Sequence, residues 1–185
     1  MQVATTRLPG VLLLQTQVFE DARGSTSETF NQRAFAAATG LDCTFVQDVC
    51  SVSRKGVLRG LHYQTAQSQA KLVRVARGQV FDVAVDLRPA SPTLGQWTGQ
   101  LLSAQEGLQI WIPAGFAHGF LVLSDSAEVH YKTSDFYAPE HSRSMAWNDP
   151  QLGIDWPLQA LGSTPVLLSD QDARAVAFAQ AELPA

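Results

Sequence analysis

One part of the chain brings together side chains that could move protons on a negatively charged ligand. It begins GVLRGLHYQ at 56–64 and continues with KLVRV at 71–75, and both runs have the composition of short strands. His62 could act as a base near neutral pH, and the cations Arg59 and Lys71 could hold an anionic substrate beside it. We therefore expect a sheet-lined pocket and an enzyme that transfers protons.

The strand that carries these residues poses a geometric problem. Regular alternation would place Arg59 and His62 on opposite faces of the strand. If both line one pocket, the strand must change register between them, and Gly60 is the residue that allows a bulge. The sequence therefore predicts a β-bulge at Gly60.

A second histidine follows a turn motif at 111–120, which reads WIPAGFAHGF. The pattern Pro113-x-Gly115-x-x-His118 matches the second sequence motif of the cupin barrels, in which a tight turn directs the histidine into the barrel mouth. Metal-binding cupins add an H-x-H pair and a glutamate from a first motif, because a metal needs several convergent ligands. The corresponding stretch here, 60–64, lacks that pair. We therefore expect a cupin barrel without a metal.

Other polar residues are better explained by structure than by chemistry. His130 alternates with apolar neighbours along a strand and His141 falls in a loop, so neither is expected in the site. Asp82 and Asp86 alternate with apolar residues in QVFDVAVDL at 79–87. Because any half-buried strand shows such alternation, we favour a solvated face for these carboxylates over a catalytic role.

Short strands separated by turns dominate the remaining pattern. Helices are expected only at 31–39, which Gly40 ends, and at 170–183, where Ser169 can cap the helix and Asp172 can complete a capping box. Evenly spaced strands with little helix indicate an antiparallel sandwich or barrel. We predict an all-β single domain over the whole chain, residues 1–185, with a few short peripheral helices. The expected strands are 45–52, 57–63, 72–76, 79–87, 95–102, 109–112, 119–123 and 127–133.

Composition argues against several classes of partner. Thirteen Lys and Arg against 17 Asp and Glu give a net charge of −4, and no basic run could neutralise a nucleic-acid backbone. The longest apolar run near the start, 11–14, is too short for a membrane span or a signal-peptide core. We expect a cytoplasmic protein with no nucleic-acid or membrane partner. The chain has no Gly-rich dinucleotide fingerprint, so no redox cofactor is expected.

Several segments together closely resemble the dTDP-4-dehydrorhamnose 3,5-epimerase family. The resemblance implies a cupin fold, that is, a double-stranded β-helix or jelly-roll barrel. It also implies a cofactor-free homodimer that acts on dTDP-4-dehydro-6-deoxy-D-glucose. Epimerisation at carbons 3 and 5 would give dTDP-4-dehydro-L-rhamnose in dTDP-L-rhamnose biosynthesis. The segments that carry the resemblance are 57–64, 71–74, 78–86, 91–97, 111–120, 131–137 and 147–156.

The resemblance implies roles for four residues of the reaction centre. His62 matches the proton-abstracting base and Asp172 the carboxylate that orients it. Tyr131 matches the proton donor on the opposite face of the sugar. A ketone at carbon 4 acidifies the hydrogens at carbons 3 and 5, so the enolate oxygen needs a fixed cation, and Lys71 is our candidate.

Other matched positions concern substrate binding. Arg23 and Glu28 match residues that reach the nucleotide of the neighbouring subunit, and Tyr137 matches the aromatic that stacks on thymine. Lys71 and Arg59 match residues that hold the keto-sugar and its diphosphate, and His118 falls at another substrate-contact position. The substrate-binding residues expected in all are Phe19, Arg23, Glu28, Gln47, Arg59, His118, Tyr137 and Ser142.

Two other functions are compatible with the same residues. One is a single-position epimerase or ketoisomerase that acts on a related dTDP-keto-deoxysugar. The other is a cupin that binds sugar nucleotides without turnover. The presence of both His62 and Tyr131 favours an enzyme, because a protein that only binds has no need of an opposed acid and base.

Overall fold

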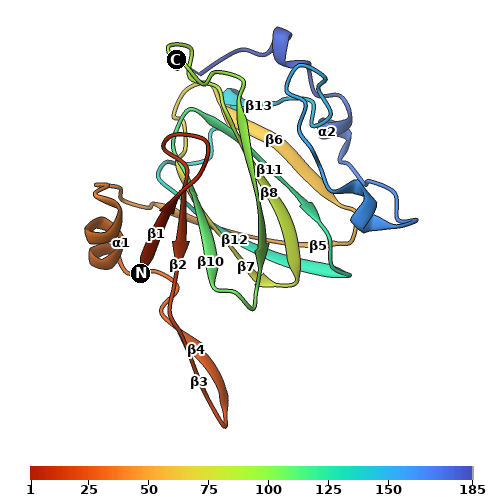
Figure 1. Ribbon diagram of the computed structural model, residues 1–185. Helices are drawn as coiled ribbons and strands as arrows, with labels where there is room; N and C mark the ends of the chain where they lie inside the picture. Colours follow the sequence, from red (N-terminus) through yellow and green to blue (C-terminus); the bar gives the residue numbers. More distant parts are fainter. Residues whose placement is uncertain (185) are drawn as a thin grey trace.

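Two antiparallel sheets face each other and form the body of the molecule (Figure 1). The computed structural model describes residues 1–184. The first sheet has the order β1 (Gln2–Thr5), β2 (Leu12–Gln15), β10 (Leu108–Ile112), β7 (Lys71–Arg77), β12 (Ser126–Thr133) and β5 (Gln47–Arg54). The second has the order β13 (Ser142–Ser144), β6 (Leu58–Gln64), β11 (Phe116–Val122), β8 (Gln79–Asp86) and β9 (Trp97–Ser103). The all-β cupin-type fold expected from the sequence is confirmed.

Apolar side chains from the inner faces of both sheets form the main core. Alternate residues of β7, β8, β11 and β12 point between the sheets, as the two-residue period of a strand requires. This core includes Val73, Val75, Val80, Ala84, Ile110, Phe116, Phe120, Val122 and Val129, each buried.

The chain ends cover the outer faces of the two sheets. Helix α1 (Gln32–Thr39) packs Phe35 against Trp111 on the first sheet, and residues 145–184 pack against the second. The two coverings lie on opposite sides of the body (Figure 1). Helix α1 is the helix predicted at 31–39. Asn31 caps its start by accepting from Ala34 N–H, and Gly40 ends it in the left-handed conformation, with φ of 71°.

The helix predicted at 170–183 is wrong in length. Only α2 (Asp170–Ala173) forms, with Ser169 as its N-cap as expected, and short 3₁₀ helices lie at Pro139–His141, Leu158–Leu161 and Phe178–Gln180. The chain leaves the helix because Val176 makes a parallel bridge to Met145. Tertiary pairing has therefore replaced local helix propensity.

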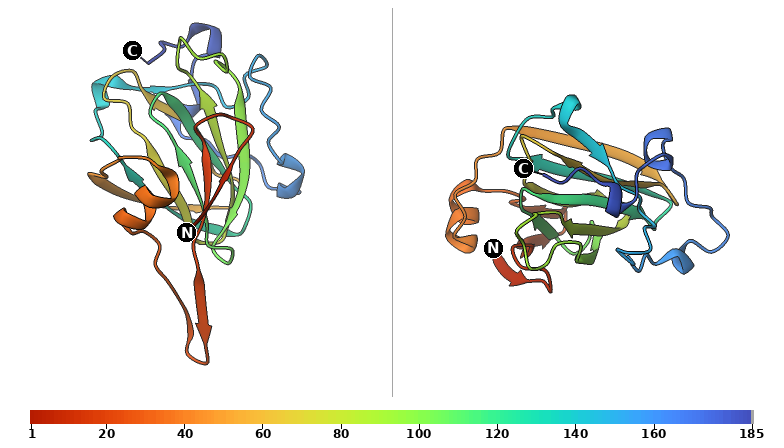
Figure 2. Two further views of the ribbon diagram at one scale, coloured as in Figure 1. Left: turned by 60° about the vertical axis from the view of Figure 1, so that its left-hand side comes forward. Right: turned by 90° about the horizontal axis from the view of Figure 1, so that it is seen from above.

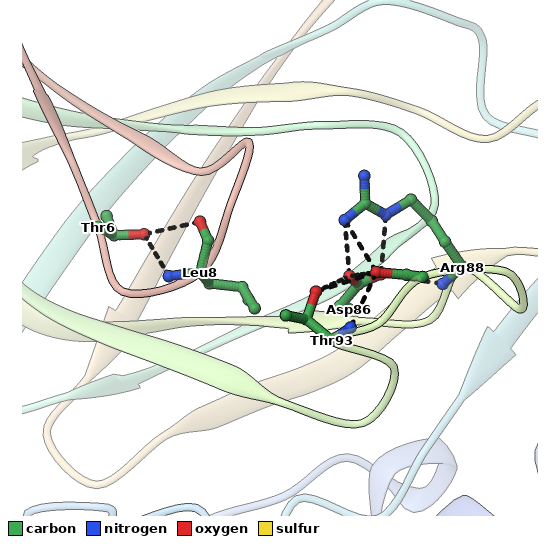
Figure 3. A network of polar contacts seen from close by, with 6 residues as sticks. Thr6, Leu8, Asp86, Arg88 and Thr93 are labelled. Atoms are coloured by element: carbon green, nitrogen blue, oxygen red, sulfur yellow. Dashed lines mark hydrogen bonds and ion pairs between the residues drawn. The ribbon is translucent and has the colours of Figure 1, made fainter.

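The solvated face predicted for Asp82 and Asp86 is also wrong, because both residues are completely buried. Strand β8 lies between β11 and β9, the other sheet covers its inner face, and the C-terminal segment covers its outer face. Asp86 accepts hydrogen bonds of 2.6 Å from Arg88, Ser91 and Thr93, and Figure 3 shows Arg88 and Thr93 converging on it. Burial, the largest influence, raises the pKa of Asp86, but these donors together hold it well below its ordinary value.

Strands near the N-terminus were missed by the sequence patterns. Among them, β3 (Val18–Asp21) and β4 (Gly24–Ser27) pair only with each other, and every residue in them is exposed. This hairpin, here called the arm, projects away from the two sheets (Figures 1 and 2). An isolated two-stranded hairpin is marginal in water, so the arm needs a further surface to pack against.

No helix within residues 1–184 is both long enough and apolar enough to cross a membrane.

Candidate active site

A cavity of about 370 Å³ opens where residues of β6 face residues of β5, β7 and β12. Its wall thus comes from both sheets, and the loop before β13 and helix α2 complete it. The lining residues are Gln47, Val49, His62, Tyr63, Gln64, Gln69, Lys71, Tyr131, Thr133, Tyr137, Ser142 and Gln171. Six of the predicted site residues are in this group: Gln47, His62, Lys71, Tyr131, Tyr137 and Ser142.

His62 and Asp172 form a hydrogen-bonded pair at the cavity wall. His62 Nε2 lies 2.5 Å from Asp172 Oδ1, and the His62 side chain is 40% exposed whereas that of Asp172 is 3% exposed. Burial raises the pKa of Asp172, but hydrogen bonds from His62, Ser169 and the Gly60 amide hold it below its ordinary value. An ionised Asp172 accepts from Nε2–H, so the free Nδ1 of His62 carries the lone pair that can take a proton.

The predicted bulge at Gly60 is present. His62 pairs with His118 while Arg59 pairs with Phe120, so β6 has one more residue than β11 between these pairs. Gly60 has φ of 120°, and a Cβ there would lie 2.6 Å from the Gly119 Cα. Arg59 itself is exposed and does not line the cavity, and its Nε donates to Ser53 Oγ of β5 at 3.0 Å.

Lys71 lies at the start of β7 with its side chain almost entirely enclosed. Burial lowers its pKa to about 8, against the charge of Asp82, which raises it. A lysine in this state is still mostly protonated at neutral pH, and the low polarity around it strengthens its interaction with any anionic atom in the cavity.

Tyr131 faces the cavity from β12, in the sheet opposite His62. Burial raises the pKa of its phenol and the charge of Arg59 only partly offsets this, so the hydroxyl keeps its proton at neutral pH. Lys71 Nζ lies 5.9 Å from the centre of the Tyr131 ring. The cavity therefore has a base on one sheet, and a proton donor and a cation on the other.

His118 is buried behind this cavity and is not part of its lining. Its Nε2 lies 2.8 Å from Asp82 Oδ2, and both side chains are enclosed. Burial lowers the pKa of His118, although Asp82 opposes the effect, so the ring is neutral at pH 7 and donates from Nε2. The substrate contact that the resemblance implies for His118 stays a prediction. In the structure its ring bonds to Asp82, which the sequence had placed on a solvated face.

The sequence did not predict some lining residues whose hydrogen bonds fix the loops of the cavity wall. Gln64 is buried, donates to Gln67 O at 2.7 Å and accepts from Ala138 N–H at 2.9 Å, so it ties two loops to β6. Thr133 and Gln69 likewise bond to Asp135 O, at 2.8 and 2.9 Å. Local sequence carries no signal for such residues, because their partners are distant or in irregular loops.

One cluster in residues 1–184 has the composition of a metal site, and it lies outside the cavity. Cys50, Glu128 and His130 approach one another on the outer face of β5 and β12. However, Arg74 Nη2 lies 3.1 Å from His130 Nδ1, and His130 Nε2 lies 2.8 Å from Glu128 Oε1. Because Arg74 donates to Nδ1, the proton of His130 is on Nε2 and no lone pair there is free for a metal.

Comparison with known proteins identifies the family. The profile of dTDP-4-dehydrorhamnose 3,5-epimerase matches residues 5–180. The chain belongs to this family. It is 57% identical over 182 residues to the dTDP-4-dehydrorhamnose 3,5-epimerase of Pseudomonas aeruginosa, with 98% of each chain covered.

Solved structures agree with this assignment to the epimerase family. The dTDP-6-deoxy-D-glucose-3,5-epimerase of Legionella pneumophila, in complex with dTDP-4-keto-L-rhamnose, superposes with a TM-score of 0.94 at 46% identity, covering 99% of this chain and 97% of that one. A 3'-monoepimerase from Streptomyces bikiniensis, in complex with dTDP-quinovose, superposes with a TM-score of 0.90 at 35% identity, covering 100% of this chain and 92% of that one.

Five residues that resemblance to the epimerase family implicates in substrate binding do not line this cavity, namely His118 and Arg59, described above, and Phe19, Arg23 and Glu28. Phe19 and Arg23 lie on the arm, where Arg23 pairs with Asp21 at 2.6 Å. Glu28 follows the arm and accepts from Asn31 Nδ2 at 3.1 Å. In a single chain, therefore, these three residues make no contact with the cavity.

Proposed function

We propose that this protein epimerises dTDP-4-dehydro-6-deoxy-D-glucose at carbons 3 and 5, giving dTDP-4-dehydro-L-rhamnose. The enzyme is an isomerase that abstracts and returns protons beside the 4-ketone. Its place is in dTDP-L-rhamnose biosynthesis, and the nucleotide substrate supports a cytoplasmic location.

The observation that best supports this reaction is the placement of His62 and Tyr131 on opposite sheets across one cavity. Inversion at carbon requires a proton to leave one face of the sugar and another to arrive at the opposite face. The pair of His62 with Asp172 suits the first step, and the protonated phenol of Tyr131 suits the second.

The proposed chemistry follows from these positions. His62 Nδ1 takes the proton from the carbon beside the ketone, and the electron pair of that C–H bond moves to the ketone oxygen as an enolate. The Lys71 ammonium donates a hydrogen bond to that oxygen, and Asp172 stabilises the imidazolium that forms. The enolate then collapses, and carbon takes the Tyr131 hydroxyl proton on the other face. The His62 imidazolium then releases its proton to solvent and the Tyr131 phenolate regains one from solvent. With both groups reset, the same steps at the second carbon complete the reaction.

Action at both carbons is favoured over action at one by the comparisons. The Pseudomonas relative named a 3,5-epimerase is 57% identical to this chain, whereas the Streptomyces 3'-monoepimerase is 35% identical. Incubation with dTDP-4-dehydro-6-deoxy-D-glucose in deuterated water, followed by NMR of the recovered sugar, tests this directly. Deuterium and inverted configuration at carbons 3 and 5 are expected. Deuterium at carbon 3 alone would identify a single-position epimerase instead.

We further propose a homodimer in which the arm of each chain completes the nucleotide site of the other. The arm follows the end of β2, where Gln15 pairs with Leu108 at one end of β10. Ile112, at the other end of β10, pairs with Lys71 of the cavity wall. Leu108 and Ile112 are four positions apart, which corresponds to roughly 13 Å along the strand. The arm then projects farther from the body (Figure 1). Arg23 at the tip is thus directed away from its own cavity and is available to a partner.

Mixing two inactive variants tests the shared site. Arg23→Ala and His62→Ala are each expected to be strongly impaired as homodimers. After subunit exchange, a mixed dimer contains one site with an intact His62 from one chain and an intact Arg23 from the other. Activity should therefore reappear on mixing. If mixing restores nothing while light scattering shows that mixed dimers have formed, the arm does not act in trans.

A further inference from the structure

The buried carboxylate of Asp82 has one oxygen without a hydrogen-bond partner. Oδ2 accepts from His118 Nε2 at 2.8 Å, whereas Oδ1 has no partner among the described residues. The residue is 0% exposed, on the inner face of β8. Buried polar atoms in native proteins nearly always have a partner, and a buried carboxylate needs a compensating charge. The surroundings of Oδ1 should therefore supply a cation.

Lys71 is the cation on which the charge of Asp82 acts. It comes from β7 in the opposite sheet, its side chain is enclosed, and Asp82 is the charged group whose field favours its protonated form. His118, which is neutral, holds the carboxylate from the other side. The other titratable or charged groups nearby are His62 on β6, its partner Asp172 on α2, and Tyr131 on β12. Arg59 on β6 is exposed, and its charge acts on Tyr131.

We propose that Asp82 is a positioning residue that keeps Lys71 protonated, so that Lys71 can hold the enolate oxygen. This inference rests on the proposed function, since it supplies the cation that the reaction uses. Asp82 itself is not among the residues that line the cavity, and it acts through Lys71. His118 holds the carboxylate through Oδ2. Lys71 and Asp82 form no ion pair in the structure, so Asp82 acts on the ammonium through its charge rather than through a direct contact. The role of His118 is then to hold Asp82 rather than to bind the sugar.

The direct test is the titration of Lys71 in the protein without substrate. Lys55, Lys71 and Lys132 are the lysines of the chain, so NMR of protein labelled at lysine Cε can follow each one. Asp82→Asn keeps the size of the side chain and can still accept from His118, but it removes the charge. The Lys71 midpoint should fall by about one pH unit or more in this variant. Asp86→Asn is the matched control, an equally buried aspartate on the same strand, and it should leave the Lys71 midpoint unchanged.

A second variant and a kinetic readout separate this role from a purely structural one. Asp82→Ser also removes the charge and is used if Asp82→Asn does not fold, as judged by thermal unfolding. With substrate, the alkaline limb of kcat/KM should move to lower pH in the Asp82 variant by the same amount as the Lys71 midpoint. In a Lys71→Arg background, where this limb should be absent, the Asp82 substitution should leave the pH profile unchanged, because arginine stays protonated.

The outcomes distinguish this inference from the proposed function. An unchanged Lys71 midpoint in a folded variant without the Asp82 charge would overturn the inference, whatever the enzyme catalyses. A lowered midpoint in a protein that does not exchange deuterium into the sugar nucleotide would support the link between Asp82 and Lys71, and would instead refute the proposed function.

Discussion

The protonation of Lys71 should set the alkaline limit of the reaction. Burial lowers the pKa of Lys71 to about 8, so the ammonium is lost as the pH rises through that value. A group with this pKa is about nine-tenths protonated at pH 7 and about one-tenth protonated at pH 9. If only the ammonium stabilises the enolate, kcat/KM should therefore fall about tenfold between these two values. Tyr131 does not add to this limb, because burial raises the pKa of its phenol above the ordinary value of 10.0.

The assay is the rate of deuterium entry into the substrate, measured by NMR across this pH range in buffers of constant ionic strength. Lys71→Arg is the matched variant, because arginine keeps its charge throughout the range although its shape differs. Its absolute rate should be lower, and its profile should lack the limb near pH 8. The assignment is refuted if Lys71→Arg keeps the same limb, since another group would then be titrating.

Three further outcomes are expected. His62→Ala should abolish deuterium exchange while the fold remains, and Asp172→Asn should lower the rate less, because it weakens only the support of the imidazolium; wild-type exchange in His62→Ala would contradict the assignment of the base. Tyr131→Phe should still exchange deuterium but fail to invert the carbon efficiently, a loss of about 10²-fold or more in net epimerisation; inversion of both carbons at the parent rate would mean that another group or water is the donor. Activity should survive exhaustive treatment with EDTA, and a loss that a divalent ion restores would overturn the expectation of a metal-free reaction.

The strand pattern and the local turns were readable from sequence because they depend on neighbouring residues. Asn31 and Gly40 bound α1 through contacts within a few positions. The bulge at Gly60 was predicted because regular alternation would send Arg59 and His62 to opposite faces, and glycine tolerates a bulge. The identity of His62 and Tyr131 as chemical candidates also came from the chain, through the resemblance of its segments to a family. These inferences needed no knowledge of distant contacts.

The tertiary structure decided what surrounds each polar side chain. Alternation in 79–87 could not distinguish a face covered by the opposite sheet from a face in water, so Asp82 and Asp86 were placed in solvent. The pattern at 170–183 could not anticipate that Val176 would pair with Met145 and end the helix early. In both cases the deciding partner lies far away in sequence, and local propensity carries no information about it.

The protonation states of the site residues also depend on contacts between residues that are far apart in sequence. The chain alone provides His62, Lys71 and Asp172, but proton transfer depends on their pairing and burial. Asp172 reaches His62 across 110 residues of sequence, and the enclosure of Lys71 lowers its pKa to about 8. The residue types are set by the sequence, whereas their charges and tautomers follow from desolvation and hydrogen bonds that exist only once the two sheets and the C-terminal segment have come together.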